Sequence, residues 1–160
     1  MSIEKARLHL ARWGKDALVT EHEVSSATVE LAAQALHTEA GRIAKTLSFL
    51  NGERTLLVVA AGDARVDSGK LKKTFGLKKA RMVPAEEVEP RTGHAVGGVC
   101  PFGVNDGVDV WLDESLRRYA TVFPACGSSN SAIEMTMEEL ERHSGYTAWV
   151  DVCKDWQEEE

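Results

Sequence analysis

The chain has few cysteines and no long apolar run, and both absences narrow the class of protein. Its three cysteines are odd in number and widely spaced, which gives neither a disulfide framework nor a CxxC metal site. No apolar run approaches the roughly 20 residues that a membrane helix needs. The charged N-terminus lacks the apolar stretch of a signal peptide. We therefore expect a cytoplasmic protein with reduced thiols and no membrane partner.

The familiar signatures of catalysis are also missing. Four of the five histidines, His22, His37, His94 and His143, are scattered without the spacing of metal ligands, so we expect structural or surface roles for them. No Ser-His-Asp set is evident, and the glycine-rich loop at 97–103 matches neither the phosphate loop nor the dinucleotide fingerprint. The sequence thus predicts no metal and no cofactor.

Charge is distributed unevenly along the chain. The net charge is −6, yet the stretch Arg65–Arg81 holds seven basic residues and one acid. Lys70, Lys72 and Lys73 fall on the exposed side of a helix that we expect between Asp67 and Gly76. Such a basic island can bind nucleic-acid phosphates on an otherwise acidic protein, although a merely solvated helix face would have the same composition.

The pattern of apolar residues predicts a single α/β domain over residues 1–160. The chain is of one-domain size, with 43% hydrophobic and 28% charged residues. Strand patterns, including Thr46–Leu50, Thr55–Ala60, His94–Val99 and Val108–Leu112, alternate with helix patterns. Several connections between strands are short, so we expect a mixed, largely antiparallel sheet flanked by helices.

Lys45 is the first candidate functional residue. It stands at the entry to an apolar strand, and Leu47 and Phe49 share its face because side chains alternate along a strand. An ammonium at the rim of the core needs an anionic partner, which a substrate phosphate or carboxylate can supply. A lysine snorkelling at a strand end is the competing interpretation.

Two small-residue loops are further candidates. The run GGVCPFG at 97–103 lets the main chain approach a ligand, and its N–H groups can hold a developing oxyanion. A tight structural turn would give the same run. The stretch Cys126–Ser131 can line a pocket or form a hairpin turn.

These motifs together resemble the YbaK/EbsC family. The runs GRIAKTLSF, LVVAAGDARVD, GHAVGGVCPFG and PACGSSNSAIEMT occur in the family's order and span roughly Ala17–Val152. The family includes freestanding relatives of the editing domain of bacterial prolyl-tRNA synthetases. The resemblance implies a mixed α/β fold without a metal, and a trans-editing hydrolase that deacylates mischarged aminoacyl-tRNA. It also implies aminoacyl-tRNA as a partner, and an aminoacyl-tRNA synthetase as a further candidate partner.

The resemblance assigns roles to particular residues. Lys45 matches the family's invariant lysine, which would anchor the tRNA 3′ end, while main-chain N–H groups near Gly98 and Gly103 would bind the ester carbonyl. Water activation would come largely from a ribose hydroxyl of the tRNA. We expect the remaining pocket residues to be small or apolar and to line the amino-acid site: Thr20, His22, Leu47, Phe49, Cys100, Pro101, Phe102, Gly127, Ser128 and Ser129.

Substrate choice is left open by the sequence. Some relatives that remove cysteine depend on a tyrosine in the first strand, where this chain has Thr20, so cysteine is disfavoured. A small polar lining would suit alanine, serine or threonine, but one methylene changes binding by only ~1–3 kcal/mol. Two alternatives to editing remain: a non-catalytic tRNA-binding or regulatory module, and a hydrolase of small esters that uses Cys100 as nucleophile.

Overall fold

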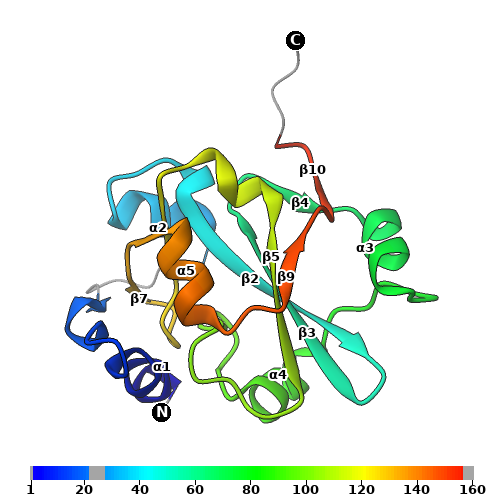
Figure 1. Cartoon of the computed structure of the whole chain (residues 1–160), viewed down its shortest axis with the longest axis horizontal. Coiled ribbons are helices and arrows are strands. Elements are labelled where there is room, and N and C mark those ends of the chain that lie inside the picture. Colours follow the sequence, from blue (N-terminus) through cyan, green and yellow to red (C-terminus); the bar gives the residue numbers. More distant parts are fainter. Residues whose placement is uncertain (1, 22–27, 157–160) are drawn as a thin grey trace.

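A six-stranded mixed sheet forms the centre of the protein, seen here in a computed structural model that describes residues 2–21 and 28–156 (Figure 1). The strand order is β8-β6-β2-β3-β5-β9. The strands are β2 (Ile43–Asn51), β3 (Arg54–Ala61), β5 (Val108–Asp113), β6 (Thr121–Pro124), β8 (Met135–Thr136) and β9 (Ala148–Val150). The predicted α/β class and mixed sheet are confirmed.

Parallel pairing is more common in this sheet than we predicted. Only β2 with β3 and β6 with β8 are antiparallel, whereas β2 with β6, β3 with β5 and β5 with β9 are parallel. Three of the five strand pairs are parallel, so the expectation of a largely antiparallel sheet was wrong. That expectation included a strand at 94–99, but this segment contains a turn and no strand. The chain therefore passes from β3 to the parallel β5 through a long crossover that contains two helices.

The hairpin of β2 and β3 supplies the middle of the core. Gly52, at a φ of 61°, and Glu53 make the two-residue turn between the strands. From Thr55 onward every residue of β3 is buried, because the strand is paired on both edges and covered on both faces. The near-continuous apolar run of this segment is explained by that position.

The helices begin and end where side-chain caps predict. Helix α3 (Ser68–Phe75) starts at Asp67 and ends at Gly76, while α5 (Met137–Ser144) starts with a capping box of Thr136 and Glu139. Helix α2 (Val29–Ala35) is capped by Thr28, whose side chain accepts a hydrogen bond from Leu31 N–H. The remaining helices are α1 (Ser2–Ala11) and α4 (Ala85–Thr92). No helix among residues 2–21 and 28–156 is both long and apolar enough to cross a bilayer.

Helices cover both faces of the sheet. On one face the ring of Phe75 from α3 meets Trp111 edge-on at 5.0 Å. On the other, Arg91 of α4 donates a hydrogen bond to the Thr55 hydroxyl. The strand register places Lys45, Leu47 and Phe49 on the face of Trp111, and Thr46 and Ser48 on the face of Thr55.

Shorter elements lie at the periphery. Two further strand pairs are β1 (Thr20–Glu21) with β7 (Ser131–Ala132), and β4 (Arg65–Val66) with β10 (Cys153–Lys154). The 3-10 helices are η1 (Asp16–Leu18), η2 (Ala40–Arg42) and η3 (Glu114–Arg118).

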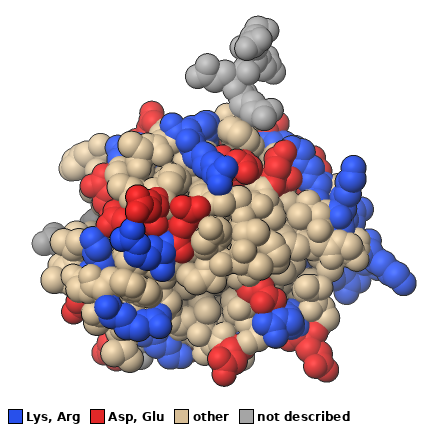
Figure 2. All heavy atoms as spheres, viewed as in Figure 1, with Lys and Arg blue, Asp and Glu red and all other residues tan. Residues whose placement is uncertain are grey.

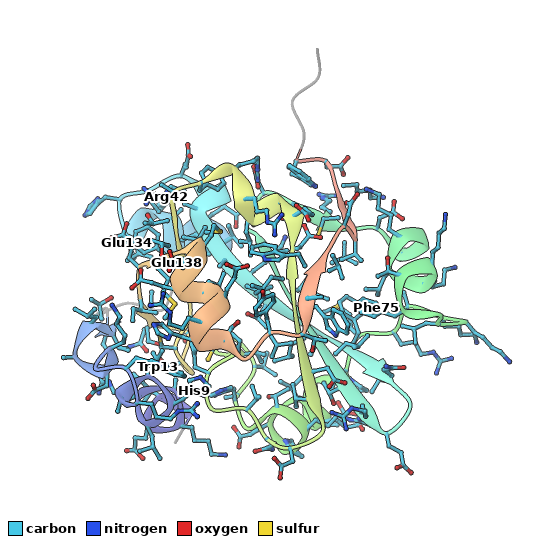
Figure 3. All side chains as sticks on the ribbon, viewed as in Figure 1. His9, Trp13, Arg42, Phe75, Glu134 and Glu138 are labelled. Carbon is cyan, nitrogen blue, oxygen red and sulfur yellow. The ribbon has the colours of Figure 1, made fainter. Side chains whose placement is uncertain are left out.

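Helix α1 is fastened to the rest of the molecule by His9 (Figure 3). The Nε2 atom of His9 contacts the carbonyl of His143 at 2.5 Å, while its Nδ1 atom accepts from Gly103 N–H at 3.0 Å and faces Arg12 at 2.9 Å. Trp13 lies four residues after His9, and the centroid of its ring is 4.4 Å from that of the His143 ring. A neutral ring with its proton on Nε2 satisfies all of these contacts, whereas a second proton on Nδ1 would face two donors.

Stability should therefore fall in mild acid. Burial lowers the pKa of His9, His94 and His143 below the ordinary value of 6.5. The unfolded chain then binds more protons than the folded chain below about pH 6.5, so the free energy of unfolding decreases as the pH drops. We expect a loss on the order of 1 kcal/mol between pH 7.5 and 5.5 in urea titrations.

The variant His9→Gln should lower stability at pH 7.5 and show a smaller further loss at pH 5.5. His37→Asn is the matched control, since His37 is exposed and lies outside this contact. A profile that is flat from pH 7.5 to 5.5, or one that His9→Gln leaves unchanged in slope, would contradict the role given to His9.

Candidate active site

Strand β2 has a break in the pairing along one of its edges. β6 pairs there only with Ile43 and Ala44. Further along the same edge, Val83 N–H donates to Ser48 C=O at 3.0 Å, and Leu50 N–H donates to Arg81 C=O at 2.9 Å. Main-chain groups alternate in direction along a strand, so those of Thr46 lie on this edge between the two partners. Within the described ranges, no strand pairs with Thr46 on that side.

The break lies against a cavity of about 460 Å³. Most of its lining is apolar, and Lys45 is the one titratable side chain that contributes to it among the described residues. The lining comprises Ala44–Ser48 of β2, Thr28 and Val29 at the start of α2, Met82, Val83, Ala85 and Val88 around α4, Val96, Gly97 and Val99 of the glycine-rich loop, and Ala125. Such an enclosure, apolar with a few polar groups, is typical of small-molecule sites.

Lys45 is held in place by main-chain oxygens. Its ammonium donates to the carbonyls of Gly62, at 3.4 Å, and Ala64, which follow β3. Burial lowers the pKa of Lys45, and the nearby carboxylate of Asp63 opposes this shift. An ammonium has three N–H donors, so one is left over after the two carbonyls. The side chain is thus oriented by the fold and still has a proton to donate.

The glycine-rich loop reaches the cavity through Gly97 and Val99. Gly97 has a φ of 91°, which side chains rarely adopt, and it leaves room at the cavity wall. Gly98 faces the other way, where an added Cβ would lie 2.5 Å from the main chain of Gly127 and Ser128. This contact explains why position 98 needs glycine, while Gly127 has a φ of 92°, which other residues rarely adopt.

The structure corrects two predicted oxyanion donors. Gly98 N–H donates to Ala95 C=O at 3.0 Å, and Gly103 N–H donates to His9 Nδ1 at 3.0 Å. Both groups are therefore used within the fold, and Gly103 packs on Lys5 of α1 rather than lining the cavity. The residues of this loop that line the cavity are Val96, Gly97 and Val99.

Cys100 is part of the core and does not line the cavity. It is fully buried, and burial raises the pKa of its thiol to about 12. His94 Nε2 lies 3.6 Å from the sulfur, a partner that sequence spacing did not suggest. The same nitrogen lies 2.7 Å from Phe102 C=O, so it carries the proton and cannot accept one from the thiol. The pair therefore lacks the chemistry of an activated nucleophile.

Of the predicted pocket residues, Leu47 lines the cavity. Ser128 and Ser129 line a smaller adjoining hollow of about 30 Å³, which shares Gly97 and Ala125 with it. Gly127 is buried against Gly98. Thr20 is exposed and donates to Ala132 C=O, and His22 lies outside the described residues. The remaining three predicted residues are buried away from the cavity, where their apolar surface packs the core: Phe49, Pro101 and Phe102.

The apolar side of the cavity was hardly predictable from the sequence. Ala85 and Val88 come from one face of α4, and Met82 and Val83 precede that helix. Their spacing of three is a helix signal, but it does not distinguish a cavity wall from ordinary core. Asp106, the acid nearest in sequence to the glycine-rich loop, lies in a separate depression with Glu53 and Arg91.

The three lysines predicted to contact phosphate differ in their surroundings. Lys70 donates to the Asp151 carboxylate at 3.1 Å and to Cys153 C=O at 3.0 Å, so its charge is already paired. Lys72 and Lys73 have no ion-pair partner within the described part of the chain. Figure 2 shows the Lys and Arg side chains that project from the α3 end of the molecule.

Comparison with known proteins shows the family of the chain. The aminoacyl-tRNA editing domain matches residues 23–143. The uncharacterized protein YwhH of Bacillus subtilis (strain 168) is 52% identical over 158 residues, which are 98% of this chain and 100% of that protein. A solved structure described as that of a "putative trans-editing enzyme for prolyl tRNA synthetase" has a TM-score of 0.86 and 33% identity, covering 96% of this chain and 97% of its own.

The similarity extends to part of a larger enzyme. A proline–tRNA ligase of Bacillus cereus (strain AH820) is 26% identical over 102 residues, which are 64% of this chain but only 18% of the ligase. The domain match covers more than half of the chain, and the solved structure shares the fold along nearly all of it. The chain therefore belongs to the aminoacyl-tRNA editing domain family.

Proposed function

We propose that this protein hydrolyses the ester bond of mischarged aminoacyl-tRNA in trans, in the cytoplasm, and that the cavity beside Lys45 is where the reaction occurs. The observation that carries the proposal is the make-up of the cavity. It joins apolar walls for an amino-acid side chain, one oriented ammonium, and the main chain of a glycine loop. Family membership supports the same activity.

In this reaction the protein has to do little beyond positioning the ester and the attacking water. Water attacks the carbonyl carbon, the bond to the ribose oxygen breaks, and that oxygen takes up a proton, giving a free amino acid and uncharged tRNA. An aminoacyl ester is already reactive, so orientation and oxyanion stabilisation suffice. Lys45 would use its remaining N–H on the 3′-terminal nucleotide, and N–H groups at Gly97 and Val99 would hold the carbonyl oxygen.

No carboxylate or histidine from the described residues lines the cavity. A general base usually contributes ~10²–10⁴-fold, and in this proposal the substrate supplies it. The free hydroxyl of the terminal ribose lies next to the ester and can orient or activate the water. The apolar lining also revises the expected side chain: a small alkyl group, such as that of alanine, fits these walls better than serine or threonine.

Mutation of Lys45 tests the proposal directly. We expect Lys45→Ala to lose at least ~10²-fold in single-turnover deacylation of a mischarged tRNA panel, because it removes the charge that positions the 3′ end. Circular dichroism and melting should show a folded protein. Lys73→Ala is the control, since Lys73 is exposed and away from the cavity. Wild-type turnover in Lys45→Ala would remove Lys45 from the mechanism.

Mutation of Cys100 separates this reaction from a thiol-dependent one. Because the thiol is buried and protonated, Cys100→Ser should keep activity within about tenfold of wild type, and alkylating reagents should inhibit slowly or not at all. The matched variant Cys126→Ser tests for a general effect of removing a buried thiol. A loss of ~10³-fold confined to Cys100→Ser would favour the small-ester hydrolase instead.

A further inference from the structure

A basic segment follows α3 and leads directly to the mouth of the cavity. Lys78, Lys79 and Arg81 are all exposed, and their side chains have no hydrogen-bond or ion-pair partner within the described residues. This distinguishes them from Lys70, whose charge is paired with Asp151. Three free positive charges close together on a chain of net charge −6 attract a polyanion.

The fold fixes where this segment ends. Arg81 C=O accepts from Leu50 N–H, and Val83 N–H donates to Ser48 C=O, so Met82 is held opposite Phe49 at the edge of β2. Met82 and Val83 both line the cavity. Lys78 lies four positions before Met82, so the Cα atoms of these two residues are at most about 14 Å apart, and the limits for Lys79 and Arg81 are shorter.

The mouth itself is apolar and exposed. Met82 is 57% and Val96 63% exposed, although both line the cavity. Large side chains left open to solvent beside a cavity indicate a surface that a ligand covers. Methionine is polarizable and packs well against aromatic rings. A phosphate-binding run that ends at such a surface suits a single nucleic-acid strand, whose charged backbone and flat bases need both kinds of contact.

We propose that Lys78, Lys79 and Arg81 bind the phosphates of the unpaired 3′ strand of tRNA, and that Met82 and Val96 hold its last base at the cavity mouth. This inference rests on the proposed function for the identity of the strand. It assigns the principal phosphate contacts to the segment 78–81 beside the cavity, and not to Lys72 and Lys73 on the face of α3. Specificity for the strand's end follows from the short distance between charges and mouth.

Binding of uncharged tRNA tests the inference without any hydrolysis. The double variant Lys78→Ala/Lys79→Ala should weaken binding by about tenfold and reduce the slope of log K against log salt by about 1.4, as expected for two single-strand phosphate contacts. Lys72→Ala/Lys73→Ala removes the same charge and is the matched control, with an expected change under twofold. Met82→Ser should weaken binding while leaving the salt slope unchanged.

A second binding measurement uses a tRNA that lacks its four 3′-terminal nucleotides. Wild type should bind it about tenfold more weakly than intact tRNA, and Lys78→Ala/Lys79→Ala should bind both RNAs equally. Equal losses in the two lysine pairs, or no binding of tRNA by wild type, would overturn the inference. If Lys78→Ala/Lys79→Ala weakens tRNA binding but the wild type hydrolyses no aminoacyl-tRNA, the result contradicts only the proposed reaction. If hydrolysis depends on Lys45 but Lys78→Ala/Lys79→Ala binds tRNA like the wild type, the result contradicts only this inference.

Discussion

The site depends on the incomplete pairing of one edge of β2. β6 ends at Pro124, which pairs with Ala44 and has no N–H to continue the ladder. The segment 81–83 joins the same edge only from Ser48 onward. Main-chain groups in a protein interior must be satisfied, so the stretch between these partners has to face water or a ligand. The cavity, the glycine loop and the basic segment are all arranged around this one break.

Chemistry in such a cavity is limited by what lines it. Apolar walls strengthen every electrostatic contact inside, so in the proposed reaction a few main-chain N–H groups would have a large effect on a developing oxyanion, and one oriented ammonium would have a large effect on the 3′-terminal nucleotide. The same walls would penalise a buried carboxylate, and no described one is present in the lining. The proposed reaction is compatible with this lining, because its substrate is already activated and brings its own polar group.

The sequence predicted those features that local physics determines. The start of α3 at Asp67, its end at Gly76 and the apolar strand at Thr55–Ala60 all follow from neighbouring residues, and all are confirmed. The functions of the glycines in the loop at 97–103 were not predictable in the same way, because Gly98 and Gly103 owe their packing to residues far away in the chain. Cys100 is buried for the same reason. Long-range packing, rather than local pattern, decides which loop atoms meet the cavity.

The most direct test of this account compares two substrates that differ in one atom. A mischarged tRNA with a normal terminal adenosine and one lacking the free ribose hydroxyl are incubated with excess enzyme, and single-turnover hydrolysis is followed for each. If the substrate supplies the base, both bind with similar affinity and the deoxy substrate reacts at least ~10²-fold more slowly. Equal rates, together with an inactive Asp106→Asn enzyme, would show that the protein supplies the base and that the cavity works differently.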